Sequence, residues 1–168
     1  IAADLLVTTQ PTNVAECVGG NNQMVVAVSG GSGAVSYQWQ SSPNGLAGWA
    51  NATGGGATTS IFTPPSSVAG STWYRVIISA SGVGCDNTLS DTARATITPD
   101  LSVTTQPSNI SECVGGTATM TVAVTGGVGT ISYQWQSSPD GTTGWANASG
   151  AGATTATYTP SSATAGTT

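Results

Sequence analysis

The sequence is almost without charged side chains, and this scarcity excludes several functions. It contains no lysine and no histidine, and its only basic residues are Arg75 and Arg94. Charged residues make up 5% of the chain, against about 25% in a typical soluble domain. A nucleic-acid-binding protein needs a basic patch to neutralise phosphates, and two arginines among seven acidic residues cannot form one. Binding to anionic lipid is disfavoured for the same reason.

The missing histidine also removes the common catalytic arrangements. Ser-His-Asp and Cys-His sites are excluded, and the cysteines lack the paired spacing of zinc ligands. Asp86 and Asp91 flank one loop, which is more simply a solvated turn than a pair of catalytic carboxylates. Glycine-rich stretches such as GGSG occur without the lysine of a phosphate-binding loop. We therefore expect no enzymatic activity, no catalytic residue and no cofactor.

Long apolar runs are absent too. None approaches the ~20 residues that span a bilayer, so we expect no direct membrane insertion. Calcium at domain junctions is the one metal to consider, since Asp4 and Asp100 lie there. Calcium takes roughly six to eight oxygen ligands, and each junction offers few carboxylates, so a junctional calcium ion is a minor alternative.

What the sequence does contain is a repeat with a period of 96 residues. SYQWQSSPNGLAGWANATG begins at Ser36 and SYQWQSSPDGTTGWANASG begins at Ser132. About two thirds of the aligned positions are identical, without a gap. We interpret residues 1–4 as the end of a preceding repeat, 5–100 as a complete repeat, and 101–168 as a repeat without its last two strands. We expect the chain to be an excerpt of a longer polypeptide.

Each repeat has the pattern of an all-β domain. Short runs rich in Val, Thr and aromatic residues alternate with Gly, Pro, Asn and Ser, which predicts about seven strands in ~96 residues, the size of an immunoglobulin-like β-sandwich. Strands are expected in seven segments: 5–11, 23–30, 35–42, the residues after Trp49, 58–64, 73–80 and 92–99. SPNG and SPDG are expected to be hairpin turns in which Asn-Gly or Asp-Gly supplies a positive φ.

The aromatic residues form two groups with different expected roles, core packing and ligand stacking. Trp39, with its counterpart Trp135, and Tyr74 occupy places where this fold keeps core aromatics, so we expect them to be buried. Trp49 and Trp145 follow the hairpin turn and are the candidates for stacking on a sugar ring, with Asn51 and Asn147 as hydrogen-bonding partners.

The cysteines allow three arrangements. Cys113 is the repeat of Cys17, so a full repeat has two cysteines, which favours a disulfide and an oxidising, extracellular location. The simplest pairing is Cys17 with Cys85. In a plain immunoglobulin topology these positions lie at opposite ends of the domain, and Cα atoms more than ~7 Å apart cannot be bridged. Pairing of Cys85 with Cys113 across the junction and free thiols are the alternatives.

The run ECVGG, YQWQSSPDG, GWAN and GATTATYTP, with WYRVIISASGVGCDN in the first copy, resembles the tandem immunoglobulin-like (PKD-like) repeats of large Bacteroidota surface proteins. Gliding-motility adhesins and type IX-secreted adhesins are examples. The resemblance covers nearly the whole chain. It implies export and anchoring at the outer membrane. It also implies that neighbouring repeats of the same chain contact one another and together form a stalk. The resemblance also implies that Asp91-Thr92-Ala93 matches an O-glycosylation motif, in which Thr92 is the candidate acceptor.

Three functional hypotheses follow from the sequence. The first is a non-catalytic structural repeat in the rod-like stalk of an extracellular adhesin or surface filament, favoured by the ungapped repeat and the junction ITPD, whose Pro99 restricts the linker. The second is a carbohydrate-binding module, with surface polysaccharide or other cells as partners. The third is a filament subunit that polymerises by strand donation.

Overall fold

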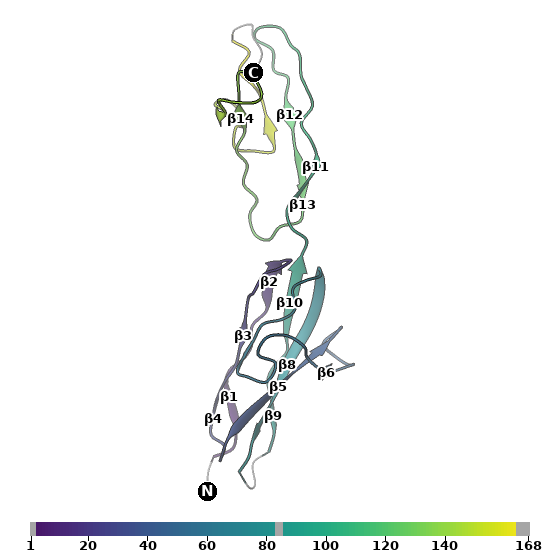
Figure 1. Cartoon of the computed structure of the whole chain (residues 1–168), viewed down its shortest axis with the longest axis vertical. Coiled ribbons are helices and arrows are strands. Elements are labelled where there is room, and N and C mark those ends of the chain that lie inside the picture. Colours follow the sequence, from purple (N-terminus) through teal and green to yellow (C-terminus); the bar gives the residue numbers. More distant parts are fainter. Residues whose placement is uncertain (1–2, 83–85, 164–168) are drawn as a thin grey trace. The chain divides into compact units, whose positions relative to one another are not determined.

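The fold is known from a computed structural model, which describes residues 3–82 and 86–163. The chain divides into two compact units, unit 1 (1–99) and unit 2 (100–168). All regular structure in the described residues is β-strand (Figure 1), so the predicted all-β class is confirmed. Accordingly, the described part of the chain offers no helix able to cross a membrane.

Unit 1 is built from short strands and two long ones. Its described strands are β1 (Leu6–Thr9), β2 (Val14–Cys17), β3 (Met24–Val25), β4 (Ala27–Ser29), β5 (Val35–Ser42), β6 (Ala50–Asn51), β7 (Ile61–Phe62), β8 (Gly70–Ala80), β9 (Thr88–Leu89) and β10 (Ala93–Thr98). The predicted strand at 35–42 coincides with β5, whereas β2 and β9 were not predicted. Both are short, and β2 (VAEC) has no apolar alternation to reveal it.

These strands form the two layers of a sandwich. The larger sheet has the order β2-β10-β8-β5-β6, with β9 also paired to β8. The other layer consists of the pairs β1-β4 and β3-β7. The first extended segment changes layer at the buried Pro11: β1 pairs with β4, and then β2 pairs in parallel with β10. Proline lacks the N–H that a continuing ladder would need, so it suits this change.

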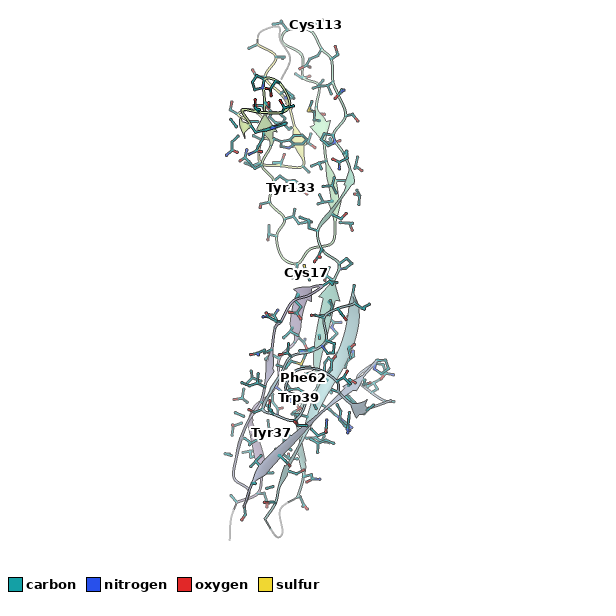
Figure 2. All side chains as sticks on the ribbon, in the orientation of Figure 1. Cys17, Tyr37, Trp39, Phe62, Cys113 and Tyr133 are labelled. Atoms are coloured by element: carbon teal, nitrogen blue, oxygen red, sulfur yellow. The ribbon has the colours of Figure 1, made fainter. Side chains whose placement is uncertain are left out.

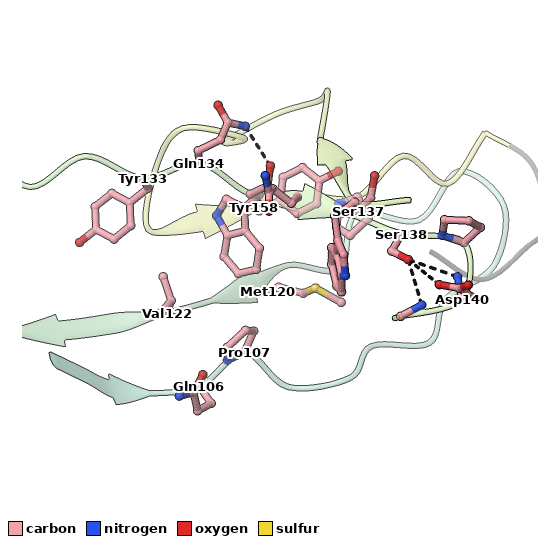
Figure 3. A pocket seen from close by; sticks show the side chains of 16 residues that line it. Gln106, Pro107, Met120, Val122, Tyr133, Gln134, Ser137, Ser138, Asp140 and Tyr158 are labelled. Atoms are coloured by element: carbon pink, nitrogen blue, oxygen red, sulfur yellow. Dashed lines mark hydrogen bonds between the residues drawn. The ribbon is translucent and has the colours of Figure 1, made fainter. Parts of the chain in front are cut away.

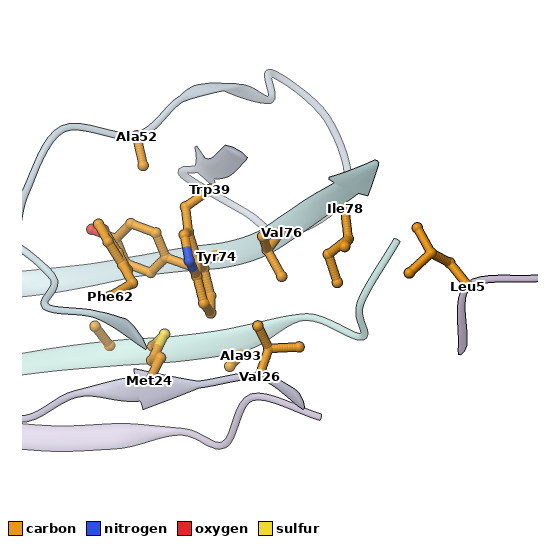
Figure 4. Packing of buried hydrophobic residues seen from close by; sticks show 11 residues of the cluster. Leu5, Met24, Val26, Trp39, Ala52, Phe62, Tyr74, Val76, Ile78 and Ala93 are labelled. Carbon is orange, nitrogen blue, oxygen red and sulfur yellow. The ribbon is translucent and has the colours of Figure 1, made fainter. Parts of the chain in front are cut away.

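The core of unit 1 lies between the layers (Figure 4). Trp39 of β5 is fully buried and stacks on Phe62 of β7, with ring centroids 5.1 Å apart. Tyr74 of β8 packs on the other side of Phe62 at 5.0 Å. The indole N–H of Trp39 donates to the carbonyl of Thr59 at 2.8 Å, which satisfies the one polar group that this side chain takes into the core. Burial raises the pKa of the Tyr74 phenol, and a hydrogen bond with Thr72 partly opposes this.

Unit 2 forms the same layers from fewer strands. They are β11 (Ser102–Thr105), β12 (Met120–Thr121), β13 (Ala123–Thr125), β14 (Gln136–Ser137), β15 (Ala146–Asn147) and β16 (Thr157–Tyr158). They form the pairs β11-β13, β12-β16 and β14-β15, which repeat β1-β4, β3-β7 and β5-β6. Trp135 stacks on Tyr158 at 5.4 Å as Trp39 stacks on Phe62. The sequence reaches the counterpart of Thr72, the third residue of β8.

The predicted hairpins at SPNG and SPDG are confirmed, because β5 pairs antiparallel with β6 and β14 with β15. The glycine of each motif, Gly45 or Gly141, has a positive φ, and so has the glycine three residues later, Gly48 or Gly144. The connection from β5 to β6 extends from Pro43 to Trp49. Asn44 uses its side-chain oxygen to accept the backbone N–H groups of Leu46 and Ala47 at 2.9 and 3.0 Å. The asparagine therefore stabilises a seven-residue hairpin loop, Pro43 to Trp49, by side-chain hydrogen bonds.

Candidate functional site

The outward face of the large sheet in unit 1 gathers aromatic and basic side chains. Because alternate residues of a strand share a face, Trp73 and Arg75 of β8 point outward while Tyr74 points into the core. Arg94 of β10 is paired directly with Trp73 and lies on the same face. Both cations of the protein are therefore on this one surface, which we call the outer face.

Each arginine lies over a tryptophan. The Arg75 guanidinium carbon is 4.2 Å from the ring centroid of Trp49, and the corresponding distance from Arg94 to Trp73 is 5.7 Å. Arg75 also donates from Nε to the side-chain oxygen of Gln40 at 3.0 Å. These contacts hold the loop before β6 against the sheet. One face of the Trp49 ring is thus covered by the Arg75 guanidinium.

The stacking candidates of the two copies differ in exposure. Trp49 is half-buried under Arg75, whereas Trp145 is 54% exposed. Asn51 and Asn147 are exposed beside them. The register pairs Asn51 with Gln40, and Gln136 donates to the Asn147 side chain at 3.4 Å. In both copies an indole, an amide pair and a glycine-rich loop lie together.

A cavity opens in unit 2 where unit 1 is closed (Figure 3). It has a volume of about 780 Å³ and is lined by residues of β12, β14 and β16 with their flanking loops, including Met120, Val122, Tyr133 and Tyr158. All lining residues are identical to their counterparts in unit 1 except Tyr158 in place of Phe62 and Asp140 in place of Asn44. We call this surface the unit 2 groove. The sequence did not predict the unit 2 groove as a site, because its apolar and aromatic residues have the pattern of core residues.

At the rim of the groove, Asp140 repeats the loop contacts of Asn44 with a charge. Its carboxylate accepts the backbone N–H groups of Thr143 and Thr142 at 2.7 and 2.8 Å, and the Thr143 hydroxyl at 2.7 Å. The backbone and hydroxyl hydrogen bonds from Thr143, followed by that from Thr142, hold the pKa of Asp140 well below its usual range. The carboxyl is solvent-exposed and carries its charge at neutral pH.

The ECVGG motif is a structural loop. Glu16 is 7% exposed and accepts the Asn22 backbone N–H at 2.6 Å, and Glu112 accepts the Ala118 N–H at the same distance. A Cβ on Gly20 would lie 2.3 Å from the Glu16 carboxylate, so the second glycine gives the acid its space. These residues organise the loop.

The cysteine positions do not form a disulfide among the described residues. Cys17 ends β2, opposite Thr98, and is half-buried, while Cys113 is exposed (Figure 2). Cys85, on which both predicted pairings depend, lies outside the described residues. The two pairings stay predictions.

The remaining candidates lie at the surface of unit 1. Thr92 is exposed just before β10, between the exposed Asp91 and the buried Ala93. Asp4 and Asp100, the candidates for junctional calcium, are exposed. Across residues 3–82 and 86–163, no three carboxylate, cysteine or histidine side chains gather as a metal site would require. Glycosylation and calcium binding stay untested.

Comparison with known proteins agrees with this tandem β-sandwich. The family model described as Domain of unknown function (DUF8696) matches residues 8–99 and again 103–168. The chain therefore belongs to this family and contains two copies of its domain. No curated protein matches the sequence.

Two solved structures are similar to this chain, and the first of them shares its architecture. The three N-terminal domains of the bacteriophage RB49 highly immunogenic outer capsid protein (Hoc) match with a TM-score of 0.64 and 15% identity, over 97% of this chain and 58% of that one. Immunoglobulin domains 1–5 of Sidekick-1 match with a TM-score of 0.47 and 16% identity, over 75% of this chain and 26% of that one. The chain thus spans less than two thirds of either structure. The predicted immunoglobulin-like tandem repeat is confirmed, and the likeness concerns the fold alone.

Proposed function

We propose that this protein is a non-catalytic structural repeat of an extracellular adhesin or surface filament, in which successive immunoglobulin-like units form a stalk. The observation that carries the proposal is the pair of copies of one domain separated by a very short junction. β10 ends at Thr98 and β11 begins at Ser102, with Pro99 between them. A linker this short restricts the angles that adjacent units can adopt.

The surface chemistry supports an exposed, extended role. Both arginines are held over tryptophans, and the remaining charges are acidic, so the surface has little basic charge for intracellular polyanions. The only trypsin sites, after Arg75 and Arg94, are within β8 and β10. A stalk outside the cell needs such protection. The resemblance to Bacteroidota adhesins, including gliding-motility and type IX-secreted proteins, belongs to the same proposal, as does anchoring at the outer membrane.

Electron microscopy of the full-length protein on its cells tests this function. β8 has 11 residues, and at about 3.3 Å per residue a unit is about 36 Å long, so a stalk is expected to show an axial repeat of about 40 Å. A thin fibre with this repeat supports the proposal. Globular particles strung at irregular distances would contradict it.

A second candidate function is carbohydrate binding, which the grouping of Trp49, Asn51 and Gln40 favours. An indole face beside amide donors is suited to a sugar ring. A glycan array probed with the whole chain and with its Trp49→Ala and Trp145→Ala variants tests this function. Loss of a glycan signal in either variant supports it, and a signal that neither substitution alters rules out these tryptophans as the site.

A further inference from the structure

The loop of residues 43–49 in unit 1 presents the dipeptide Asn44-Gly45 at the surface, since Asn44 is exposed. An asparagine followed by glycine is chemically labile, because glycine has no Cβ to keep its backbone nitrogen away from the asparagine side chain. That nitrogen attacks Cγ of the asparagine and forms a C–N bond, and the side-chain NH₂ group takes up the released proton and leaves as ammonia. Water then opens the cyclic imide to an aspartyl residue, so the net reaction converts an amide and water into an acid and ammonia.

Packing fixes the glycine of this dipeptide. Gly45 has a φ of +73°, and a Cβ there would lie 2.9 Å from Cδ2 of the Trp73 ring. A residue with a side chain would therefore be strained in its backbone and would collide with the indole. The close approach of the loop to Trp73 thus requires a glycine after Asn44, and this glycine is also what makes the asparagine labile.

Hydrogen bonds hold the reacting groups apart. The Gly45 N–H, which must lose its proton before attack, donates to Ser42 Oγ at 3.0 Å. Ser42 is 1% exposed, and its hydroxyl is fixed by the Ala47 carbonyl at 2.6 Å. The Asn44 Oδ1 atom accepts the N–H groups of Leu46 and Ala47 at 2.9 and 3.0 Å. Attack requires the release of these contacts, so the reaction depends on opening of the loop.

The loop can accept the product. Within residues 3–82 and 86–163, the hydrogen bonds of the Asn44 side chain all use Oδ1, so replacing Nδ2 by oxygen removes none of them. Unit 2 shows the same loop with a carboxylate: Asp140 accepts two backbone N–H groups and the Ser138 hydroxyl, as Asn44 does in unit 1. An isoaspartyl product would instead lengthen the main chain by a methylene beside Gly45, where the loop is packed on the indole.

We propose that Asn44 is a site of spontaneous deamidation, that Ser42 restrains the reaction by holding the Gly45 N–H, and that the α-aspartyl product keeps the conformation of the 43–49 loop. The modification adds one negative charge to a chain whose net charge is −5. It converts the neutral loop of unit 1 into the charged kind that unit 2 has at Asp140. The site is independent of the stalk function and of sugar binding, because the reaction needs only the loop and water.

The test compares the whole 168-residue chain with a free peptide of residues 41–48, both incubated at neutral pH. Mass spectrometry of peptide fragments locates the new acid and separates the two aspartyl isomers. Asn44 in the folded chain is expected to react at least ~10-fold more slowly than in the peptide, because several hydrogen bonds must open first. The slowing is expected to be of the same order as the protection of the Gly45 amide against hydrogen exchange. Asn51 is exposed but precedes Ala52, and serves as the internal control that stays unmodified.

Variants of the chain separate the parts of the proposal. Ser42→Ala removes the acceptor of the Gly45 N–H and is expected to speed deamidation about 2- to 10-fold. Ser41→Ala is the matched control on the same strand, since the Ser41 side chain makes no hydrogen bond within the described residues, and it is expected to leave the rate unchanged. Asn44→Asp is the α-aspartyl product itself and is expected to leave the stability of unit 1 at neutral pH unchanged.

Three results would overturn the proposal. Equal rates in the folded chain and the free peptide would show that the loop does not restrain the reaction. An unchanged rate in Ser42→Ala, with the core amides of unit 1 still protected, would remove Ser42 from its role. Strong destabilisation of unit 1 by Asn44→Asp would show that the loop rejects the product. If Ser42→Ala unfolds unit 1, the comparison of the deamidation rate with exchange of the Gly45 amide in the unaltered chain decides, and a protected amide beside an unrestrained Asn44 contradicts the proposal.

Discussion

Units 1 and 2 have nearly the same residues around the central tryptophan and differ in how much strand those residues form. VSYQWQSS is a continuous eight-residue strand in unit 1, while ISYQWQSS forms only the two-residue strand β14 in unit 2. Likewise VAEC is the strand β2, but ISEC at 110–113 is not a strand. The difference lies in the partners: β5 pairs with β8, and β2 pairs with β10.

The comparison teaches that strand length here is a property of the sheet and not of the local sequence. A strand needs a neighbour for its hydrogen bonds, and its β-propensity depends on the packing that the neighbour supplies. By contrast, contacts that stay within the shared segments are the same in both units. The indole hydrogen bonds of Trp39 and Trp135 are both 2.8 Å long, and the Glu16 and Glu112 loops are alike.

The largest expected difference between the units is the effect of removing the central tryptophan. Trp39→Ala creates a cavity in a closed core and is expected to lower the free energy of unfolding of unit 1 by about 3–5 kcal/mol. Trp135→Ala acts in an open groove that solvent already reaches, so the loss in unit 2 is expected to be less than half as large. Hydrogen exchange resolved by residue measures both units in one chain. Equal losses would show that the groove is closed in solution.

A glycine that both units use in the same way is expected to give equal effects. Gly20→Ala and Gly116→Ala each place a Cβ 2.3 Å from a glutamate oxygen, of Glu16 or Glu112. We expect each to destabilise its own unit by about 1–3 kcal/mol through overpacking, as measured by chemical denaturation. Gly55→Ala, whose Cβ would lie 3.6 Å from Thr63, is the control and is expected to be nearly neutral. A large destabilisation by Gly20→Ala together with a small one by Gly116→Ala would contradict this expectation. It would mean that the Glu16 loop is held rigid by the pairing of β2 with β10.

The sequence predicted the features that depend on local pattern. The repeat, the all-β class, the long strand at 35–42 and the paired layers all follow from alternation and from turn residues. It did not predict β2 or β9, because their pairing with β10 and β8 is non-local and their own patterns are weak. The outer face was missed for the same reason: only the register between β8 and β10 places Trp73 beside Arg94.

The outer face itself gives a smaller difference. Arg75→Ala removes the contact with Trp49 and the hydrogen bond to Gln40, and is expected to destabilise unit 1 by about 1 kcal/mol. Arg94→Ala is the matched control, since its distance of 5.7 Å to Trp73 is longer than the 4.2 Å of the other pair and its effect is expected to be smaller. Thermal unfolding at low and high salt measures both variants. A larger loss for Arg94→Ala would reverse this order of the two contacts.

The smallest expected difference is in pH dependence, and it arises from one exchange, Asn44 in unit 1 for Asp140 in unit 2. The folded-state pKa of Asp140 lies below its value in the unfolded chain, about 4. The carboxylate therefore stabilises unit 2 fully above about pH 4, and this contribution is lost as the pH falls through the folded-state pKa. Asn44 makes the same two backbone contacts without a proton to gain.

Asp140→Asn is thus expected to flatten the acid dependence of the stability of unit 2, and Asn44→Asp is expected to introduce an acid dependence in unit 1. Residue-resolved hydrogen exchange between about pH 2 and 6 compares the variants. An unchanged acid dependence in Asp140→Asn would contradict this role of Asp140.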